Sequence, residues 1–352
     1  MPPRKTRDIE VPETDRLEGF PHPRENRPLI GHAEQLARVT RVLHAGRPPQ
    51  GWLITGPPGV GKATLAYRIA RYLLAFGATD RGPPNLDVPV RDPASLQISA
   101  GAHPGLLVIK RGLNREGRPM KEIGVDEVRK LNGFFGMTAG AGGWRIALVD
   151  PADELNENAA NGLLKLLEEP PSRSMVLLVS HVPGRLLPTI RSRCQRLDLK
   201  PLSAVEVERG LEELLPKMKT EERHALALAS GGSIGLALRL SEGDGLMLAQ
   251  EAVRLIEHAA SPDRDRLIAL AEKIARVANS VVEFGDLLAN NLSERLRARA
   301  QAGAPGLGIW LECLAALREL FPRSRGLNLE PRQTILSAAK MLSDSARRAG
   351  QI

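Results

Sequence analysis

The sequence predicts an α/β domain, built on a parallel sheet with helices on both faces, followed by regions made only of helices. Up to about residue 200, short apolar runs alternate with amphipathic helical patterns, and this alternation is typical of parallel sheets covered by helices. A glycine-rich loop at residues 56–61 joins one such run to the helix that follows it. Beyond Pro201 the helical pattern continues without further strands. These three observations set the predicted fold class.

Four apolar runs are the predicted strands, at residues 52–55, 106–109, 145–150 and 174–180. Each is short and nearly continuous in its apolar character, which indicates strands that are buried on both faces. Amphipathic helices are predicted at residues 31–43, 65–74, 159–169 and from about residue 125. Residues 76–104 are rich in Gly, Pro, Asp and Ala, and residues 110–122 are polar, so both segments are predicted to be connections.

The predicted domain boundaries follow these changes of pattern. Residues 1–21 are rich in charge and proline and are expected to form a flexible tail, and residues 22–200 form the α/β domain. A small helical domain is expected at residues 201–242, and a second helical domain at residues 243–352. In this last domain, apolar residues recur near helical spacing from Leu287 to Met341.

The composition excludes several classes of protein. No run of about 18 apolar residues is present, so no membrane span is expected, and the charged segment 1–18 lacks the apolar core of a secretory signal. Cys194 and Cys313 are far apart and are expected to be free thiols in a reducing cytoplasm. A net charge of +8 suits an acidic or nucleic-acid partner. Because only 3% of the residues are aromatic, a base-stacking platform for single strands is not expected.

The strongest motif is the run Gly56-Pro57-Pro58-Gly59-Val60-Gly61-Lys62-Ala63-Thr64, which lies between a predicted strand and a predicted helix. In such a loop, backbone N–H groups surround a phosphate and the lysine reaches the terminal phosphates. A Ser or Thr directly after the lysine ligates Mg²⁺, but here Ala63 takes that position and Thr64 comes one residue late. A helix turns by about 100° per residue, which points Thr64 away from the metal. The loop is therefore predicted to hold nucleotide phosphates and to be poorly built for hydrolysis.

Asp150 lies at the end of the third predicted strand, where an acidic residue commonly helps to position the magnesium ion and the attacking water. Pro151 follows it and has no acid–base capacity, and no feature of the sequence places Asp153 or Glu154 in the same site. His181, after the fourth strand, is predicted to be a capped polar residue rather than a catalytic base. The residues assigned to nucleotide binding are Gly56, Gly59, Gly61, Lys62, Thr64 and Asp150.

Two further runs give a specific resemblance to a known family. Residues 159–171 read AANGLLKLLEEPP, and Thr189-Ile190-Arg191-Ser192-Arg193-Cys194 follows the fourth strand as an expected exposed basic turn. Together these runs resemble the clamp-loader branch of the AAA+ ATPases, over about residues 22–240. The resemblance implies a lid domain at residues 201–242 and a collar domain at residues 243–352. It also implies that Arg193 is an arginine finger, which acts in trans on a nucleotide bound by a neighbouring subunit.

Three positions depart from the motor subunits that the chain resembles. Those subunits carry a magnesium-binding Ser or Thr, a water-polarising glutamate and a lid arginine, where this chain has Ala63, Pro151 and Gly235. Because Arg193 is retained, the combination resembles a non-motor subunit that is not a competent ATPase by itself. Two alternatives stay open. One is an active or slow ATPase motor in which Asp153 or bound water compensates for Pro151, and the other is a nucleotide-sensing AAA+ adaptor outside replication.

The resemblance also implies partners and cofactors. The expected partners are ATPase subunits of the gamma or tau type and a delta subunit in a heteropentamer, together with the sliding clamp and primed template DNA, and no membrane. No cofactor is required, although ATP or ADP with Mg²⁺ at the weakened site stays open. Many bacterial relatives insert a four-cysteine zinc module between the loop helix and the second strand. Residues 76–104 contain no cysteine, so neither zinc nor another resident metal is expected.

Overall fold

The computed structural model describes residues 19–25, 28–114, 117, 120–136, 143–276, 280–326, 329–350 and 352. The chain forms two compact units, Met1–Leu202 and Ser203–Ile352, and each is described by itself. The predicted tail lies outside the described residues up to residue 18. Among the helices that are described, none combines the length and the hydropathy that a bilayer crossing requires.

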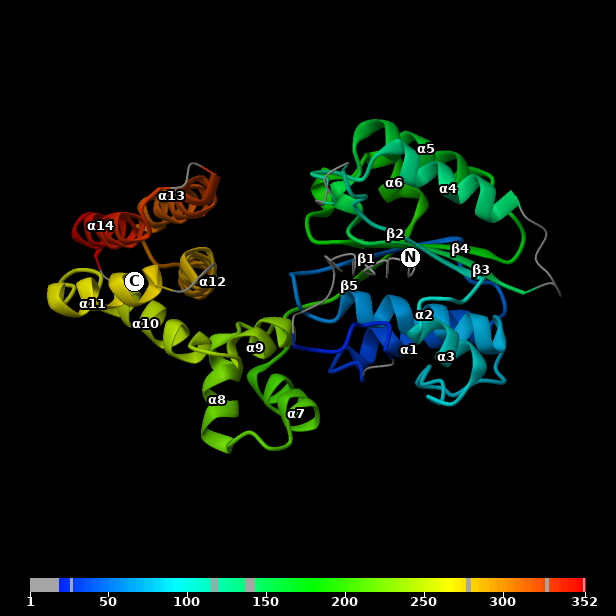
Figure 1. The fold of residues 1–352 in the computed structure, drawn as a ribbon, viewed down its shortest axis with the longest axis horizontal. Helices are drawn as coiled ribbons and strands as arrows, with labels where there is room; N and C mark the ends of the chain where they lie inside the picture. The colour runs from blue at the N-terminus through cyan, green and yellow to red at the C-terminus, as the bar shows by residue number, and fades with distance from the viewer. Residues whose placement is uncertain are drawn as a thin grey trace, which may run out of the picture. The chain divides into compact units, whose positions relative to one another are not determined.

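The first unit is built on a five-stranded parallel sheet in the order β2-β3-β4-β1-β5 (Figure 1). Its strands are β1 (Gly51–Thr55), β2 (Leu106–Ile109), β3 (Arg145–Val149), β4 (Ser174–Ser180) and β5 (Gln195–Asp198). Strand β1 lies between β4 and the edge strand β5, and it pairs with β4 in the register Gly51 to Val176 and with β5 in the register Trp52 to Gln195. All five residues of β1 are buried, as are all seven residues of β4.

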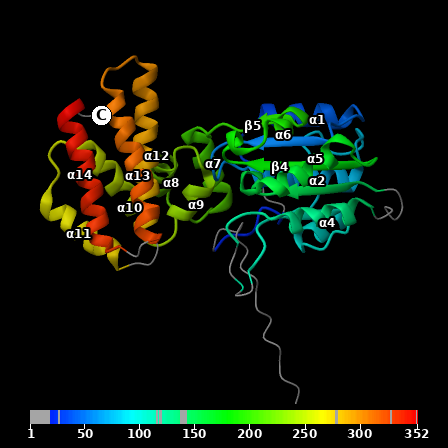
Figure 2. The same ribbon diagram turned by 90° about the horizontal axis from the view of Figure 1, so that it is seen from above.

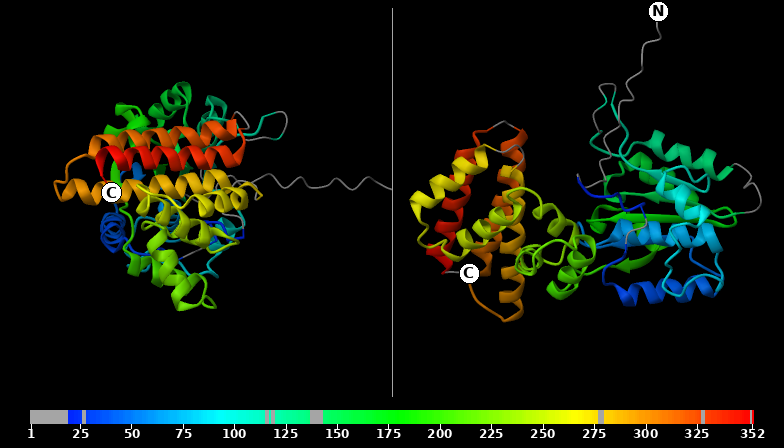
Figure 3. Two further views of the ribbon diagram at one scale, coloured as in Figure 1. Left: turned by 90° about the vertical axis from the view of Figure 1, so that its left-hand side faces the viewer. Right: turned by 60° about the horizontal axis from the view of Figure 1, so that its bottom comes forward.

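Helices cover both faces of this sheet, which confirms the predicted α/β class (Figure 1 and the right-hand view of Figure 3). On one face lie α1 (Ala33–His44), α2 (Lys62–Phe76) and α3 (Pro93–Ser99). On the other lie α4 (Val125–Gly136), α5 (Glu157–Glu168) and α6 (Pro188–Arg193). The first core lies between the sheet and α1, α2 and α3, and the second core lies between the sheet and α4, α5 and α6. Alternate side chains of β1 enter the two cores: Trp52 and Ile54 pack in the first core, and Leu53 packs in the second.

Helix α3, helix α6 and strand β5 were not predicted. Helix α3 lies within residues 76–104, where only a connection is predicted, and Asp92 starts it by accepting a hydrogen bond from the N–H of Ala94 at 2.8 Å. The run around Arg193 is not a turn, because it forms helix α6 and leads directly into the edge strand β5. Only Leu197 of β5 is buried, so this strand carries no apolar run that would reveal it.

Residues before position 22, the predicted start of the α/β domain, already pack in the first unit. Phe20 and His22 are both buried, and the ring of His22 meets the ring of Tyr67 edge-on at 5.7 Å between centroids. Arg71 on α2 donates a hydrogen bond to the carbonyl oxygen of Arg24 at 2.7 Å. His22 and Arg24 therefore contact α2, and Phe20 is buried with them in the first unit.

The second unit is all helical. Its elements are α7 (Ala204–Leu214), α8 (Thr220–Ala229), α9 (Ile234–Leu240), α10 (Gly245–Glu257), α11 (Arg264–Ala275), α12 (Ser280–Gln301), α13 (Leu307–Gly326) and α14 (Pro331–Ala349). Helices α12, α13 and α14 run side by side (Figure 2 and the left-hand view of Figure 3). The boundary predicted at residue 242 falls in the turn between α9 and α10 and stays a prediction, since both helices belong to one compact unit.

Helices α12 and α13 approach closely at Gly285, where an added Cβ would overlap the ring of the buried Phe321. We expect Gly285→Ala to lower the free energy of unfolding of this unit by about 1–3 kcal/mol, because the helices would have to move apart. Gly308→Ala is the matched control, since nothing lies within 4 Å of its added Cβ. Urea unfolding of the full chain measures both, and equal stability of the two variants would contradict this packing.

Candidate functional site

The glycine-rich loop joins β1 to α2 at the carboxyl edge of the sheet. Gly56, Gly59 and Gly61 have φ angles of +147°, +74° and +103°, which residues with a Cβ rarely adopt. A Cβ on Gly56 would also overlap the carbonyl oxygen of Leu199, the residue after β5. The loop therefore needs its glycines for conformation and for space, and in such loops the backbone N–H groups can converge on an anion.

Lys62 is the first residue of α2, and its side chain is turned back onto the loop. The residue is only 4% exposed, and its Nζ donates hydrogen bonds to the carbonyl oxygens of Gly56 at 2.8 Å and Pro57 at 2.6 Å. Burial lowers the pKa of Lys62 from its ordinary 10.5 to about 8, while the charges of Asp150 and Asp153 act in the opposite direction. The charge of Asp150 thus acts on Lys62, and the joint role of the two residues at a nucleotide stays a prediction.

Asp153 also belongs to this site, which the sequence does not reveal. Its carboxylate accepts a hydrogen bond from the backbone N–H of His181 at 2.7 Å and lies 3.8 Å from His181 Nδ1. Burial acts to raise the pKa of Asp153, but the hydrogen bonding and the charge of His181 hold it well below its usual range. Glu154 points elsewhere and pairs with Arg111 at 2.9 Å. The carboxylate of Asp153 therefore ties the end of β3 to the end of β4.

The residues present fit the phosphates of a nucleotide but not its magnesium ion. The glycine conformations and the buried Lys62 suit an anion. Ala63 contributes no oxygen to a metal, Thr64 lies one residue further along α2, and Pro151 replaces any acidic residue after Asp150. Over the described part of the chain, no cluster of three or more His, Cys, Asp or Glu side chains could hold a metal ion.

Arg193 lies at the opposite edge of the sheet from the glycine-rich loop. It ends α6, two residues before Gln195, which pairs with Trp52 near the start of β1. A Cβ on Gly51 would meet Cys194 Sγ at 2.9 Å, so Arg193 and Cys194 adjoin the amino end of β1. The loop leaves the carboxyl end of the same strand. That end lies about 13 Å away, because the five residues of β1 are joined by four steps of about 3.3 Å each. An arginine side chain cannot span that distance and the turn of the loop beyond it.

The guanidinium of Arg193 is partly exposed and has two partners within its own unit. Its Nη2 lies 2.6 Å from Glu168 Oε1, at the end of α5, and its Nη1 donates to the carbonyl oxygen of Thr189 at 3.0 Å. The pairing with Glu168 is not predicted from the sequence, although Glu168 lies in the LLEEPP run. Gly235 belongs to the second unit, in the first turn of α9, and supplies no side chain that could act as a sensor.

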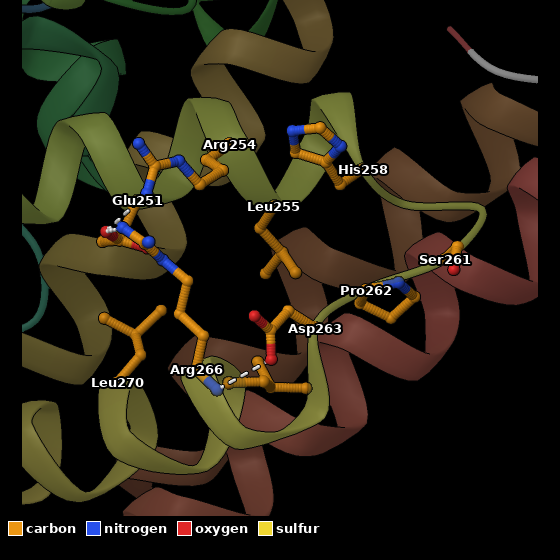
Figure 4. Close-up of a pocket in the computed structure, with 10 residues that line it drawn as sticks. Glu251, Arg254, Leu255, His258, Ser261, Pro262, Asp263, Arg266 and Leu270 are labelled. Carbon is orange, nitrogen blue, oxygen red and sulfur yellow. Dashed lines mark hydrogen bonds and ion pairs between the residues drawn. The ribbon is translucent and has the colours of Figure 1, made fainter.

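A pocket of about 480 Å³ lies between α10 and α11 in the second unit (Figure 4). Arg266 reaches across it to Glu251, with Nε 3.0 Å from Oε2, and Asp263 caps α11 by accepting from the N–H groups of Asp265 and Arg266 at 3.1 Å (Figure 4). Leu255 and Leu270 add apolar walls. Glu251, Asp263 and Arg266 thus have partners within the unit, and none of the residues assigned to the nucleotide lines the pocket.

The chain is similar to subunits of DNA polymerase III. Residues 31–203 match a family model described as DNA polymerase III, delta subunit. The chain is 40% identical over 207 residues to DNA polymerase III subunit delta' of Pseudomonas aeruginosa, which is 58% of this chain and 58% of that protein. It is 34% identical over 212 residues to subunit delta' of Escherichia coli, which is 59% of each.

A second subunit type is also similar. DNA polymerase III subunit tau of Salmonella typhimurium is 25% identical over 353 residues, which is 88% of this chain and 53% of that protein. The matched parts therefore span less than two thirds of the length of each of these relatives. Lys62 and Arg193 both lie within residues 31–203, the segment that matches the family model.

The lowered pKa of Lys62 gives a prediction for stability against pH. Between about pH 8 and 10.5, the unfolded chain keeps the Lys62 proton while the folded chain loses it, and stability rises with pH where the unfolded state binds more protons. We expect the stability of the wild type relative to Lys62→Met to rise over this range by about 3 kcal/mol at most. Urea unfolding from pH 7 to 10.5 measures the difference, and parallel curves for the two proteins would contradict the prediction.

Proposed function

We propose that this chain, which belongs to the delta' branch of the DNA polymerase III clamp-loader family, acts as a non-motor subunit of the clamp loader. It would help to place the sliding clamp on primed DNA in chromosomal replication by supplying Arg193 to the nucleotide site of a neighbouring ATPase subunit. The observation that carries the proposal is the separation of Arg193 from the chain's own glycine-rich loop across the length of β1.

That separation supports action in trans. Arg193 adjoins the amino end of β1 and cannot reach phosphates held near Lys62 at the carboxyl edge of the sheet. Its side chain is 37% exposed, so the guanidinium is open to a second chain. An arginine that completes a neighbour's site stabilises the charge on the transferring phosphoryl group, an effect of about 10³–10⁵ in rate in systems with such fingers.

The motor alternative requires a base in place of the missing glutamate, and Asp153 is the residue suggested for that role. The carboxylate of Asp153 already accepts a hydrogen bond from the backbone of His181 and has a pKa held well below its usual range. A carboxylate with so low a pKa is a weak general base. This observation favours the non-motor role, as do Ala63 and Gly235. The alternative of an adaptor outside replication has no comparable observation in its favour.

Nucleotide at the chain's own loop would serve as a bound ligand rather than as a substrate. The backbone of Gly56, Gly59 and Gly61 and the ammonium of Lys62 would hold its phosphates, with Thr64 and Asp150 close to them. Mg²⁺ would lack one ligand, because Ala63 has no hydroxyl group. We propose that assembly and function require no cofactor of the chain's own.

The proposed partners are those of a bacterial clamp loader in the cytoplasm. They are ATPase subunits of the gamma or tau type and a delta subunit in a heteropentamer, the sliding clamp, and primed template DNA. Subunits gamma and tau are among the chain's relatives, which supports assembly with proteins of the same fold. The net charge of +8 would add sequence-independent attraction to the DNA backbone. Part of the apolar surface of the second unit would pack against neighbouring subunits.

The isolated chain should show negligible ATP turnover, because the hydroxyl ligand, the glutamate and the lid arginine are replaced by Ala63, Pro151 and Gly235. We expect Ala63→Thr to tighten binding of magnesium–nucleotide without creating hydrolysis, since Pro151 remains. Binding of a fluorescent nucleotide with and without Mg²⁺, and phosphate release by the purified chain, measure the two effects. Magnesium-dependent turnover by the wild-type chain at about 1 s⁻¹ or faster, within the ordinary range of enzymes, would contradict the non-motor role.

Arg193→Ala should leave the chain folded and assembled but slow hydrolysis at one neighbouring site by about 10³-fold or more. Arg191→Ala is the matched control, because Arg191 is an exposed arginine on the same helix, α6. Single-turnover ATP hydrolysis is measured in the reconstituted, DNA-bound complex. With Arg193→Ala, the amplitude of the fast phase should fall by the contribution of the affected site.

Gel filtration shows whether the Arg193→Ala complex has assembled. Full hydrolysis by the assembled complex would exclude the finger role. Loss of assembly would show that the same arginine is an interface residue instead.

A further inference from the structure

The guanidinium of Arg193 is held by two acceptors at the end of α6. Glu168 Oε1 lies 2.6 Å from Nη2, and the carbonyl oxygen of Thr189 accepts from Nη1 at 3.0 Å. Thr189 belongs to the same helix as Arg193, whereas Glu168 is the last residue of α5. The carboxylate is therefore the contact that fixes the guanidinium relative to the rest of the unit.

The backbones that carry these two side chains are fixed by the second core. Leu167, next to Glu168, and Cys194, next to Arg193, are both buried in this core together with Ile190 of α6. The space above Gly51 is closed by the same two residues, because an added Cβ would meet Cys194 Sγ at 2.9 Å and Leu167 Cδ2 at 3.0 Å. The freedom that remains near Arg193 is thus in the side chains themselves, which are 37% and 47% exposed for Arg193 and Glu168.

A free arginine side chain has many rotamers, and most of them would not meet a phosphate on a neighbouring subunit. An ion pair with a carboxylate restricts those rotamers before the neighbour arrives. A guanidinium has five N–H donors, and among the described residues Glu168 and Thr189 take one each. About three donors therefore remain for an incoming anion, and the exposed pair is weak enough to adjust when that anion binds.

We propose that Glu168 is a positioning residue for Arg193, which holds the guanidinium in the orientation that a phosphate on the neighbouring subunit requires. This inference rests on the finger role proposed above. Glu168 does not touch the nucleotide on this account. Its effect is on the turnover rate at the neighbour's site and not on the affinity of that site for ATP.

The test compares Glu168→Ala with Glu169→Ala in the reconstituted, DNA-bound complex. Both changes remove one exposed carboxylate from the end of α5, so their effects on the helix dipole are similar. We expect Glu168→Ala to lower kcat of ATP hydrolysis at the affected site about two- to fivefold with KM unchanged, and Glu169→Ala to have no effect. Glu168→Gln, which keeps an acceptor oxygen, should restore part of the rate.

Two further measurements distinguish the positioning of Arg193 by Glu168 from a general structural effect of the substitution. In an Arg193→Ala background, Glu168→Ala should cause no further loss, because the two residues act as one unit. The difference between the wild type and Glu168→Ala should also shrink as ionic strength rises, since an exposed ion pair is screened by salt.

The outcomes also distinguish the two proposals. A wild-type rate with Arg193→Ala would overturn the finger role and this inference together. A slow Arg193→Ala complex with a normal or faster Glu168→Ala complex would overturn this inference alone. Equal losses with Glu168→Ala and Glu169→Ala, or a further loss in the Arg193→Ala background, would overturn it as well.

Discussion

The pairing of β1 with β4 on one side and β5 on the other determines where the chemistry of this protein lies. All five residues of Gly51–Thr55 are buried, and alternate side chains enter two different cores. A shift of register by one residue would exchange those side chains between the cores, so the strand is held in one place. Its carboxyl end carries the glycine-rich loop, and its amino end is packed against Cys194, next to Arg193. The two ends cannot approach each other, which makes the loop and the arginine parts of different sites.

A buried lysine sets the electrostatics at the carboxyl edge of the sheet. A cation removed from water has to find acceptors or nearby charges, and Lys62 finds the carbonyl oxygens of Gly56 and Pro57 and the field of Asp150 and Asp153. Asp153 in turn is committed to the backbone of His181. The loop, the end of β3 and the end of β4 thus form one connected set of charges. On the proposed account this set keeps the shape of a nucleotide site, and Ala63 and Pro151 stand where a hydrolytic site would have a metal-binding hydroxyl and a glutamate.

Much of the first unit could be predicted because strands β1, β3 and β4 are almost wholly buried. The sequences of β1 to β4 are almost wholly apolar. The spacing of the glycine-rich motif is enough to place Lys62 at the start of the helix that follows the loop. Strand β5 could not be predicted in this way, because it is an edge strand with only Leu197 buried. Helix α3 has seven residues in a segment rich in Gly, Pro and Asp, and it depends on the cap at Asp92. The contacts of Asp153 with His181 and of Arg193 with Glu168 join residues 28 and 25 positions apart, and no local pattern encodes such pairs.

The central claim is that Arg193 serves a nucleotide on another subunit. The most direct measurement is a high-resolution structure of the assembled clamp loader on primed DNA, with ADP and a phosphate analogue such as beryllium fluoride in its ATPase subunits. The account predicts that Nη atoms of Arg193 lie within about 3 Å, hydrogen-bond distance, of the analogue bound by the neighbouring subunit. An Arg193 that faces solvent or DNA while every neighbouring site holds its analogue in an otherwise closed state would contradict the account.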